Sequence, residues 1–247
     1  MKCSLLIGIL LANIFAYSQD KTGTLTNADL NIVSRLSTDL KENINLLQDT
    51  NGIALTKYLK AELVDEATYY AKMQTAISPI VYDNQRFKKT NGVTTLKCRD
   101  TVVTFTDIDS DGEDFKEHYY DSYLPALNQY IVKATYYEEY DYIYVDMNSG
   151  RQTSFNGSIP YLAPNKKMLL DVYHEPYENT VSFSLIKVGK KEFTTLISTE
   201  FKYWMPATDT ASAPFWGKDG YFYCIAIAVE DKDKPDAAHQ YVRIKLL

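Results

Sequence analysis

Apolar residues between positions 27 and 77 recur every three or four places, which is the spacing of one face of an α-helix. One apolar stripe covers residues 30–47, and Asn27 is predicted to be its N-cap. A second covers residues 55–73 and stops before Ser78-Pro79. The pattern therefore predicts a pair of helices, either packed on the rest of the domain or presented to a partner.

From Val93 onward the helical period gives way to short runs that are rich in β-branched and aromatic residues. The run from Tyr221 to Val229 is apolar on both faces, so it must be covered on both sides. We expect a helical region with a linker over residues 19–92 and a β-rich domain over residues 93–247. Nine runs have the strand pattern: 101–106, 129–137, 140–147, 151–155, 167–173, 180–188, 191–198, 221–230 and 240–246.

Two segments that precede strands look alike. Residues 157–167 and 213–220 each place a proline and an aromatic ring ahead of an Asn or Asp and an apolar strand. This resembles the inter-blade turn of TolB-type β-propeller repeats, found in secreted bacterial proteins of unassigned function, and covers the second half of the chain. The resemblance implies a mainly β fold: an antiparallel propeller-like meander of about three to four blade-like units, complete or incomplete, beside the N-terminal pair of α-helices. An ordinary sandwich is the alternative.

The first eighteen residues have the composition of a secretory signal peptide. Lys2 supplies the positive charge, residues 5–15 are mostly apolar, and Ala16-Tyr17-Ser18 places small residues at the two cleavage positions. The apolar stretch is shorter than the roughly 20 residues that a membrane-spanning helix needs. We therefore expect residues 1–18 to be a signal peptide and the protein to be exported, periplasmic or extracellular, without a transmembrane segment.

The net charge bears on which partners this chain can bind, and the cysteine content bears on which disulfide bonds it can form. The 26 Lys and Arg against 32 Asp and Glu give a net charge of −6, which disfavours binding to nucleic acid. After the signal peptide, Cys98 and Cys224 remain, and in an oxidising compartment they can be bridged or free. The 21 tyrosines suit either a core between stacked sheets or an exposed contact surface.

The acidic turn, residues 107–114, has the sharpest local pattern. Asp107, Asp109 and Asp111 stand at alternate positions ahead of a glycine, as at the start of a calcium-binding loop. The closing acid of such a loop is missing, because His118 stands where an EF-hand has glutamate. Weakly bound calcium is the one cofactor that this sequence suggests, and a solvated hairpin turn is the alternative.

Signals for catalysis are weak, and no catalytic residue is assigned. The three histidines and the serines form no nucleophile elbow or zinc-protease motif, and the glycines form no phosphate-binding loop. Glycoside hydrolysis needs two carboxylates on either side of a sugar. The acidic candidates for such a pair are Glu138, Glu139, Asp141, Glu175 and Glu178.

The segment 203–216 is the best candidate for a recognition loop, since it holds aromatic residues around a run of small and polar ones. We predict that Tyr203, Trp204, Phe215 and Trp216 bind a ligand, with burial in the core as an equal alternative. The sequence thus predicts a secreted, non-catalytic binding or interaction protein with a protein or glycan partner, its oligomeric state left open. The alternatives are an exported enzyme acting on glycan or cell wall, and an inhibitor or immunity-type protein that blocks a partner enzyme.

Overall fold

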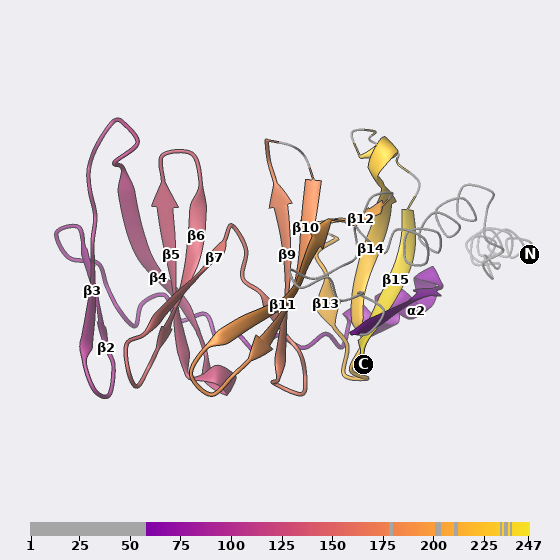
Figure 1. The fold of residues 1–247 in the computed structure, drawn as a ribbon, viewed down its shortest axis with the longest axis horizontal. Coiled ribbons are helices and arrows are strands. Elements are labelled where there is room, and N and C mark those ends of the chain that lie inside the picture. The colour runs from indigo at the N-terminus through magenta and orange to yellow at the C-terminus, as the bar shows by residue number, and fades with distance from the viewer. Residues whose placement is uncertain are drawn as a thin grey trace, which may run out of the picture.

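The computed structural model describes residues 58–177, 180–200, 204–209, 212–232, 234, 237 and 239–247. Within these residues the chain is mainly β, in four antiparallel sheets, as the strand patterns predict. The sheets stand one behind another along the long axis of the molecule, and the first and last sheets lie at opposite ends of the row (Figure 1).

Each sheet in the row is formed mainly by strands that follow one another along the chain. The first sheet has two strands, β2 (Val93–Lys97) and β3 (Val102–Thr106). The second is a meander of β4 (Lys116–Leu124), β5 (Gln129–Tyr136), β6 (Tyr140–Asp146) and β7 (Gln152–Asn156). The third contains β8 (Tyr161–Leu162), β9 (Met168–Glu175), β10 (Thr180–Val188) and β11 (Phe193–Glu200).

The fourth sheet combines the end of the chain with a strand from its N-terminal part. It contains β12 (Trp204–Pro206), β13 (Phe215–Trp216), β14 (Phe222–Ala228), β15 (His239–Leu246) and β1 (Leu59–Val64). Helix α2 (Glu66–Met73) lies beside this sheet at the end of the row (Figure 1). Short 3-10 helices at Pro125–Leu127 and Val229–Asp231 lie between strands.

Strands inside the row are apolar on both faces because a neighbouring layer covers each face. In β14, Phe222 and Cys224 pack against the third sheet, whereas Tyr223 and Ile225 pack in the core that includes Tyr69 of α2. Burying one such side chain contributes about 1.5–3 kcal/mol. The expectation that both faces of this strand are covered is confirmed.

Residues 59–64 form a strand, which corrects the prediction of a helix that begins at residue 55. All six residues pair antiparallel with β15, from Leu59 opposite Leu246 to Val64 opposite Tyr241. The helix begins only after Asp65, whose carboxylate accepts a hydrogen bond from the Thr68 backbone N–H at 2.7 Å and so caps it. The open edge of β15 therefore outweighs the helical spacing of the leucines. The predicted helix over residues 30–47 and the predicted signal peptide lie outside the described residues.

The segment that joins β1 to β2 runs the length of the row (Figure 1). It is tied by isolated bridges to the sheets that it passes: Ile77 pairs with Trp216 of the fourth sheet, and Val81 pairs with Tyr123 of the second. Strands β1 and β2, which follow one another along the chain, therefore lie at opposite ends of the molecule. No helix in the described part of the chain is long and apolar enough to cross a membrane.

Candidate functional site

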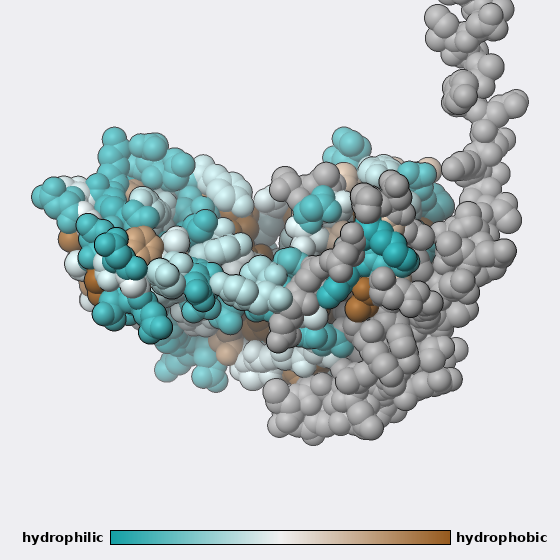
Figure 2. Space-filling model, turned by 90° about the horizontal axis from the view of Figure 1, so that it is seen from above, coloured by the Kyte–Doolittle hydropathy of each residue, from teal (hydrophilic) through white to brown (hydrophobic). Residues whose placement is uncertain are grey.

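A cavity of about 450 Å³ opens at one edge of the second and third sheets. We call it the turn pocket, because the β5–β6 turn and the β9–β10 turn contribute to its wall. These turns lie at the upper edge of Figure 1, and Figure 2 looks down on that edge, where the surface is hollowed between its two halves. The pocket is lined by Glu138, Glu139, Tyr140, Gly157, Ser158, Tyr161, Val172, Tyr173, His174, Glu175, Pro176, Tyr177 and Thr208.

The fully charged side chains that line the pocket are all glutamates. Glu138 and Glu139 are exposed, and their carboxylates form no ion pair with the residues that the structure describes. Glu175 accepts a long hydrogen bond from the Tyr173 hydroxyl, at 3.4 Å, and another from the Tyr177 backbone N–H, at 3.2 Å. No lysine or arginine of the described chain lines the pocket, so the charge there is negative.

Tyrosine rings form much of the remaining wall. Tyr177 is 71% exposed, and its hydroxyl donates to the carbonyl oxygen of Glu138 at 3.5 Å, which links the two turns. The Nζ atom of Lys133 lies 4.6 Å from the centroid of the Tyr140 ring, in a cation-π contact. Burial, and then the charge of Glu175, raise the pKa of Tyr173. The pocket thus combines aromatic faces with acceptor oxygens.

A half-buried carboxyl group is hydrogen-bonded to a residue of the pocket lining. The Ser158 hydroxyl donates a hydrogen bond to Asp171 of β9. Burial raises the pKa of Asp171 to about 6, although the bond from Ser158 opposes the shift. The hydroxyl of Tyr144, which is fully buried, has no hydrogen-bond partner among the described residues. Ser158 therefore connects the pocket to a group that can hold a proton in weakly acidic solution.

Three of the five acidic candidates from the sequence meet in this pocket. Glu138 and Glu139 come from one turn, and Glu175 comes from the other. Asp141 lies outside the lining, and burial followed by the charge of Glu139 raises its pKa. Glu178 lies outside the described residues.

The sequence reasoning missed most of the other lining residues, among them Gly157, Ser158, Tyr173 and Tyr177. Their pattern is ordinary for strand ends, so no local motif marks them. The available signal was topological, because every second turn of an antiparallel meander lies at the same edge of its sheet.

The aromatic residues predicted to bind a ligand in the 203–216 segment are core residues where the structure describes them. Trp204, Phe215 and Trp216 are 1%, 7% and 2% exposed. The indole N–H of Trp216 donates to the carbonyl oxygen of Tyr161 at 3.2 Å, which ties the fourth sheet to the third. These rings fill the gaps beside β14, as the core alternative expected, and Tyr203 lies outside the described residues.

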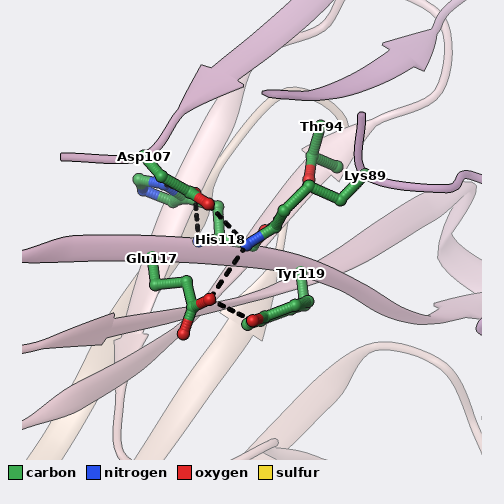
Figure 3. A network of polar contacts seen from close by, with 6 residues as sticks. All are labelled: Lys89, Thr94, Asp107, Glu117, His118 and Tyr119. Atoms are coloured by element: carbon green, nitrogen blue, oxygen red, sulfur yellow. Dashed lines mark hydrogen bonds and ion pairs between the residues drawn. The ribbon is translucent and has the colours of Figure 1, made fainter. Parts of the chain in front are cut away.

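The acidic turn is held by an ion pair (Figure 3). The Nζ atom of Lys89 lies 2.6 Å from Oδ2 of Asp107, and Oδ1 accepts a hydrogen bond from the His118 backbone N–H at 2.8 Å. Burial opposes ionisation of Asp107, but Lys89 and this N–H hold its pKa below the usual value. Lys89 also contacts Glu117 at 3.4 Å and lies over the Tyr119 ring. Asp107 is thus already partnered by a cation of the protein itself.

The predicted calcium ligands are not gathered around one point. Asp109 and Asp111 are exposed. Within the described ranges, no three His, Cys, Asp or Glu side chains are placed to hold a metal ion. Calcium binding at Asp107, Asp109 and Asp111 stays a prediction.

Cys98 and Cys224 are free thiols that belong to different cores. Cys98 is half-buried beside the core of the first two sheets, and Cys224 is buried between the last two. Burial raises the pKa of Cys224 to about 12. These cysteines are therefore unbridged in the structure, and Cys224 is a core residue.

No family model, no curated protein and no solved structure matches this chain. The TolB-type resemblance therefore stays a prediction, and the function must be argued from the turn pocket itself.

Proposed function

We propose that this protein is an exported, non-catalytic binding protein and that the turn pocket is its ligand site. The observation that carries the proposal is a cavity of about 450 Å³, lined by tyrosines and carboxylates, between turns of two packed sheets. Small-molecule sites commonly have volumes of about 300–1,000 Å³. Tyrosine rings recognise a ligand by flat contact, and carboxylates fix its orientation by accepting hydrogen bonds.

The scaffold supports this proposal, because packed sheets already hold the turns that they carry. Ordering these turns on binding therefore costs little entropy. We further propose a TolB-type, propeller-like arrangement and a periplasmic or extracellular location. The row of small antiparallel sheets and the completion of the last sheet by β1 support the first. The signal-like composition of residues 1–18 supports the second.

The test is a thermal-shift screen of the purified protein against saccharides, amino acids, amines and short peptides. At least one class should raise the melting temperature, because a ligand that binds only the folded state stabilises it. The shift should disappear in Tyr177→Ala, whose ring is exposed at the pocket, and persist in Tyr70→Ala on helix α2. A screen without any shift, or a shift that Tyr177→Ala leaves intact, would overturn the proposal.

An exported glycan-acting enzyme is the second candidate, and it is favoured by Glu138, Glu139 and Glu175 in one cavity. Glycosidases place two carboxyl groups about 5–10 Å apart across the scissile bond. If this candidate holds, the protein hydrolyses a member of a glycan panel, and Glu175→Gln or Glu139→Gln abolishes turnover without changing the melting temperature. Such a result would refute a non-catalytic function.

The exposed residues of the acidic turn support the third class, an inhibitor or immunity-type protein with a basic partner. A pull-down should then return one tight partner that Glu113→Gln and Asp111→Asn release, whereas Asp107, already paired with Lys89, contributes little. Calcium would bind the same turn weakly, and calorimetric titration with calcium chloride tests that prediction.

A further inference from the structure

The turn pocket carries negative charge, and its described lining contains no lysine or arginine that would neutralise it. Its two turns place Glu138, Glu139 and Glu175 at one cavity. The carboxylates of Glu138 and Glu139 form no ion pair with a lysine or arginine among the described residues. Since like charges at one site repel, a ligand that neutralises them gains binding free energy.

The charges of the two turns act on the same space. The hydroxyl of Tyr173 donates to Glu175 of its own turn, at 3.4 Å. Burial and Glu175 raise the pKa of this tyrosine most, and the charge of Glu139, from the opposite turn, raises it further. Tyr177 bridges the gap by its bond to the Glu138 carbonyl oxygen. A cation between the turns would therefore interact with carboxylates on both sides.

The shape and lining of the cavity favour an organic cation over a metal ion. Within the described residues, no carboxylates converge tightly enough to hold a metal. The wall instead presents tyrosine rings, whose faces attract ammonium groups. The Tyr140 ring already holds the Nζ atom of Lys133, 4.6 Å from its centroid, so the rings left for a ligand are those of Tyr161, Tyr173 and Tyr177. Rings and carboxylates together recognise an alkylammonium group by its charge and its methylene surface.

We infer that the ligand of the turn pocket carries an alkylammonium group, either a free aliphatic amine or the side chain of a lysine residue. The charged group lies between Glu138 and Glu139 on one turn and Glu175 on the other, and the methylenes lie against the tyrosine rings. This inference rests on the proposed function and names the chemical class of its ligand. A neutral sugar would leave the three carboxylates uncompensated, and an anion would be repelled.

The experiment is calorimetric titration of the purified protein with three probes. Cadaverine represents a free amine, Nα-acetyl-lysine methylamide represents a lysine side chain, and 1,5-pentanediol is the neutral analogue of cadaverine. At least one amine should bind at least about tenfold more tightly than the diol, and the difference should shrink in high salt because screening weakens charge contacts. The tighter of the two amines identifies the source of the group.

Matched variants locate the effect. Glu175→Gln, and the double variant Glu138→Gln with Glu139→Gln, should each weaken amine binding about tenfold, which corresponds to about 1.4 kcal/mol. Glu192→Gln in the β10–β11 turn, also exposed and outside the pocket lining, removes the same charge elsewhere and should leave the affinity unchanged. Unchanged melting temperatures would show that the variants still fold.

The outcomes separate the inference from the proposed function. Equal binding of the diol and the amines, or amine binding that the pocket variants leave intact, would overturn the inference. So would the absence of binding by both amines. If another compound then shifts the melting temperature in a manner that depends on Tyr177, the pocket is still a ligand site and only the cationic class is refuted.

Discussion

Gly157 is the position where a single added carbon would disturb both the fold and the turn pocket. Its φ is +57°, in the left-handed region, and its N–H donates to the Tyr140 carbonyl oxygen at 2.8 Å. A Cβ atom at this position would lie 2.8 Å from Cδ2 of Tyr173 and closer still to Cε2. The Tyr173 ring lines the pocket, so it must move to admit the methyl group.

The expected cost of Gly157→Ala has two parts. An alanine in the left-handed region costs about 1–2 kcal/mol, and forcing an extra group into a packed contact costs about 1–3 kcal/mol. We expect a loss of about 2–5 kcal/mol, or roughly 4–20 °C in melting temperature for a domain of this size. Ligand binding at the pocket should fall as well, because the Tyr173 ring is displaced.

Gly220→Ala is the matched control. Gly220 has a φ of +82°, and a Cβ atom there would meet nothing within 4 Å. Gly220→Ala should lower the free energy of unfolding only by the cost of alanine in the left-handed region, about 1–2 kcal/mol. Ligand binding should be unchanged. Urea and thermal unfolding of both variants measure the difference. If Gly157→Ala is no less stable than Gly220→Ala, the close packing of Gly157 against Tyr173 is refuted.

Three further substitutions test the energetics of the stack. Burial raises the pKa of Asp171 to about 6 from 3.8, so its protonated form stabilises the fold below pH 4, and this stabilisation is lost as pH rises through 6. Asp171→Asn should therefore match the wild type in urea at pH 4 and exceed it by about 2–3 kcal/mol at pH 7; a difference independent of pH contradicts this. Lys89→Met leaves the carboxylate of Asp107, which is 17% exposed, without its partner and should cost about 2–4 kcal/mol in urea unfolding. The exposed Lys88→Met should cost under about 0.5 kcal/mol, and equal losses would rule out the ion pair as the cause. Trp216→Ala removes a ring that is 2% exposed and should lower the unfolding free energy by about 3–5 kcal/mol; an unchanged thermal midpoint would contradict its place in the core.

Strand identity could be predicted wherever the apolar pattern was strong. All nine predicted runs are strands, and the run 180–188 has the same bounds as β10. Strand β4 was missed because two of its inward positions carry polar side chains, His118 and Ser122, beside Tyr120 and Leu124. A buried polar residue fits a strand when its neighbours accommodate it, and the sequence does not show those neighbours.

The candidate site could be predicted only in pieces. The carboxylates Glu138, Glu139 and Glu175 were recognisable as acidic turn residues, but their meeting depends on how the second and third sheets stack. For Trp204 and Trp216, the structure removes residues from the predicted site instead of bringing them together. Aromatic rings in a loop-like segment suggested recognition, whereas short edge strands bury them beside β14.

By itself the sequence determined that the C-terminal two thirds is built from short antiparallel strands, because side-chain alternation and turn residues are local properties. It also determined that β14 needs a layer on each face. Only the tertiary structure decided that residues 59–64 are a strand, since the free edge of β15 supplies hydrogen bonds that no local pattern reveals. The turn pocket likewise exists only once the sheets stand side by side, because its walls come from turns about 35 residues apart in the chain.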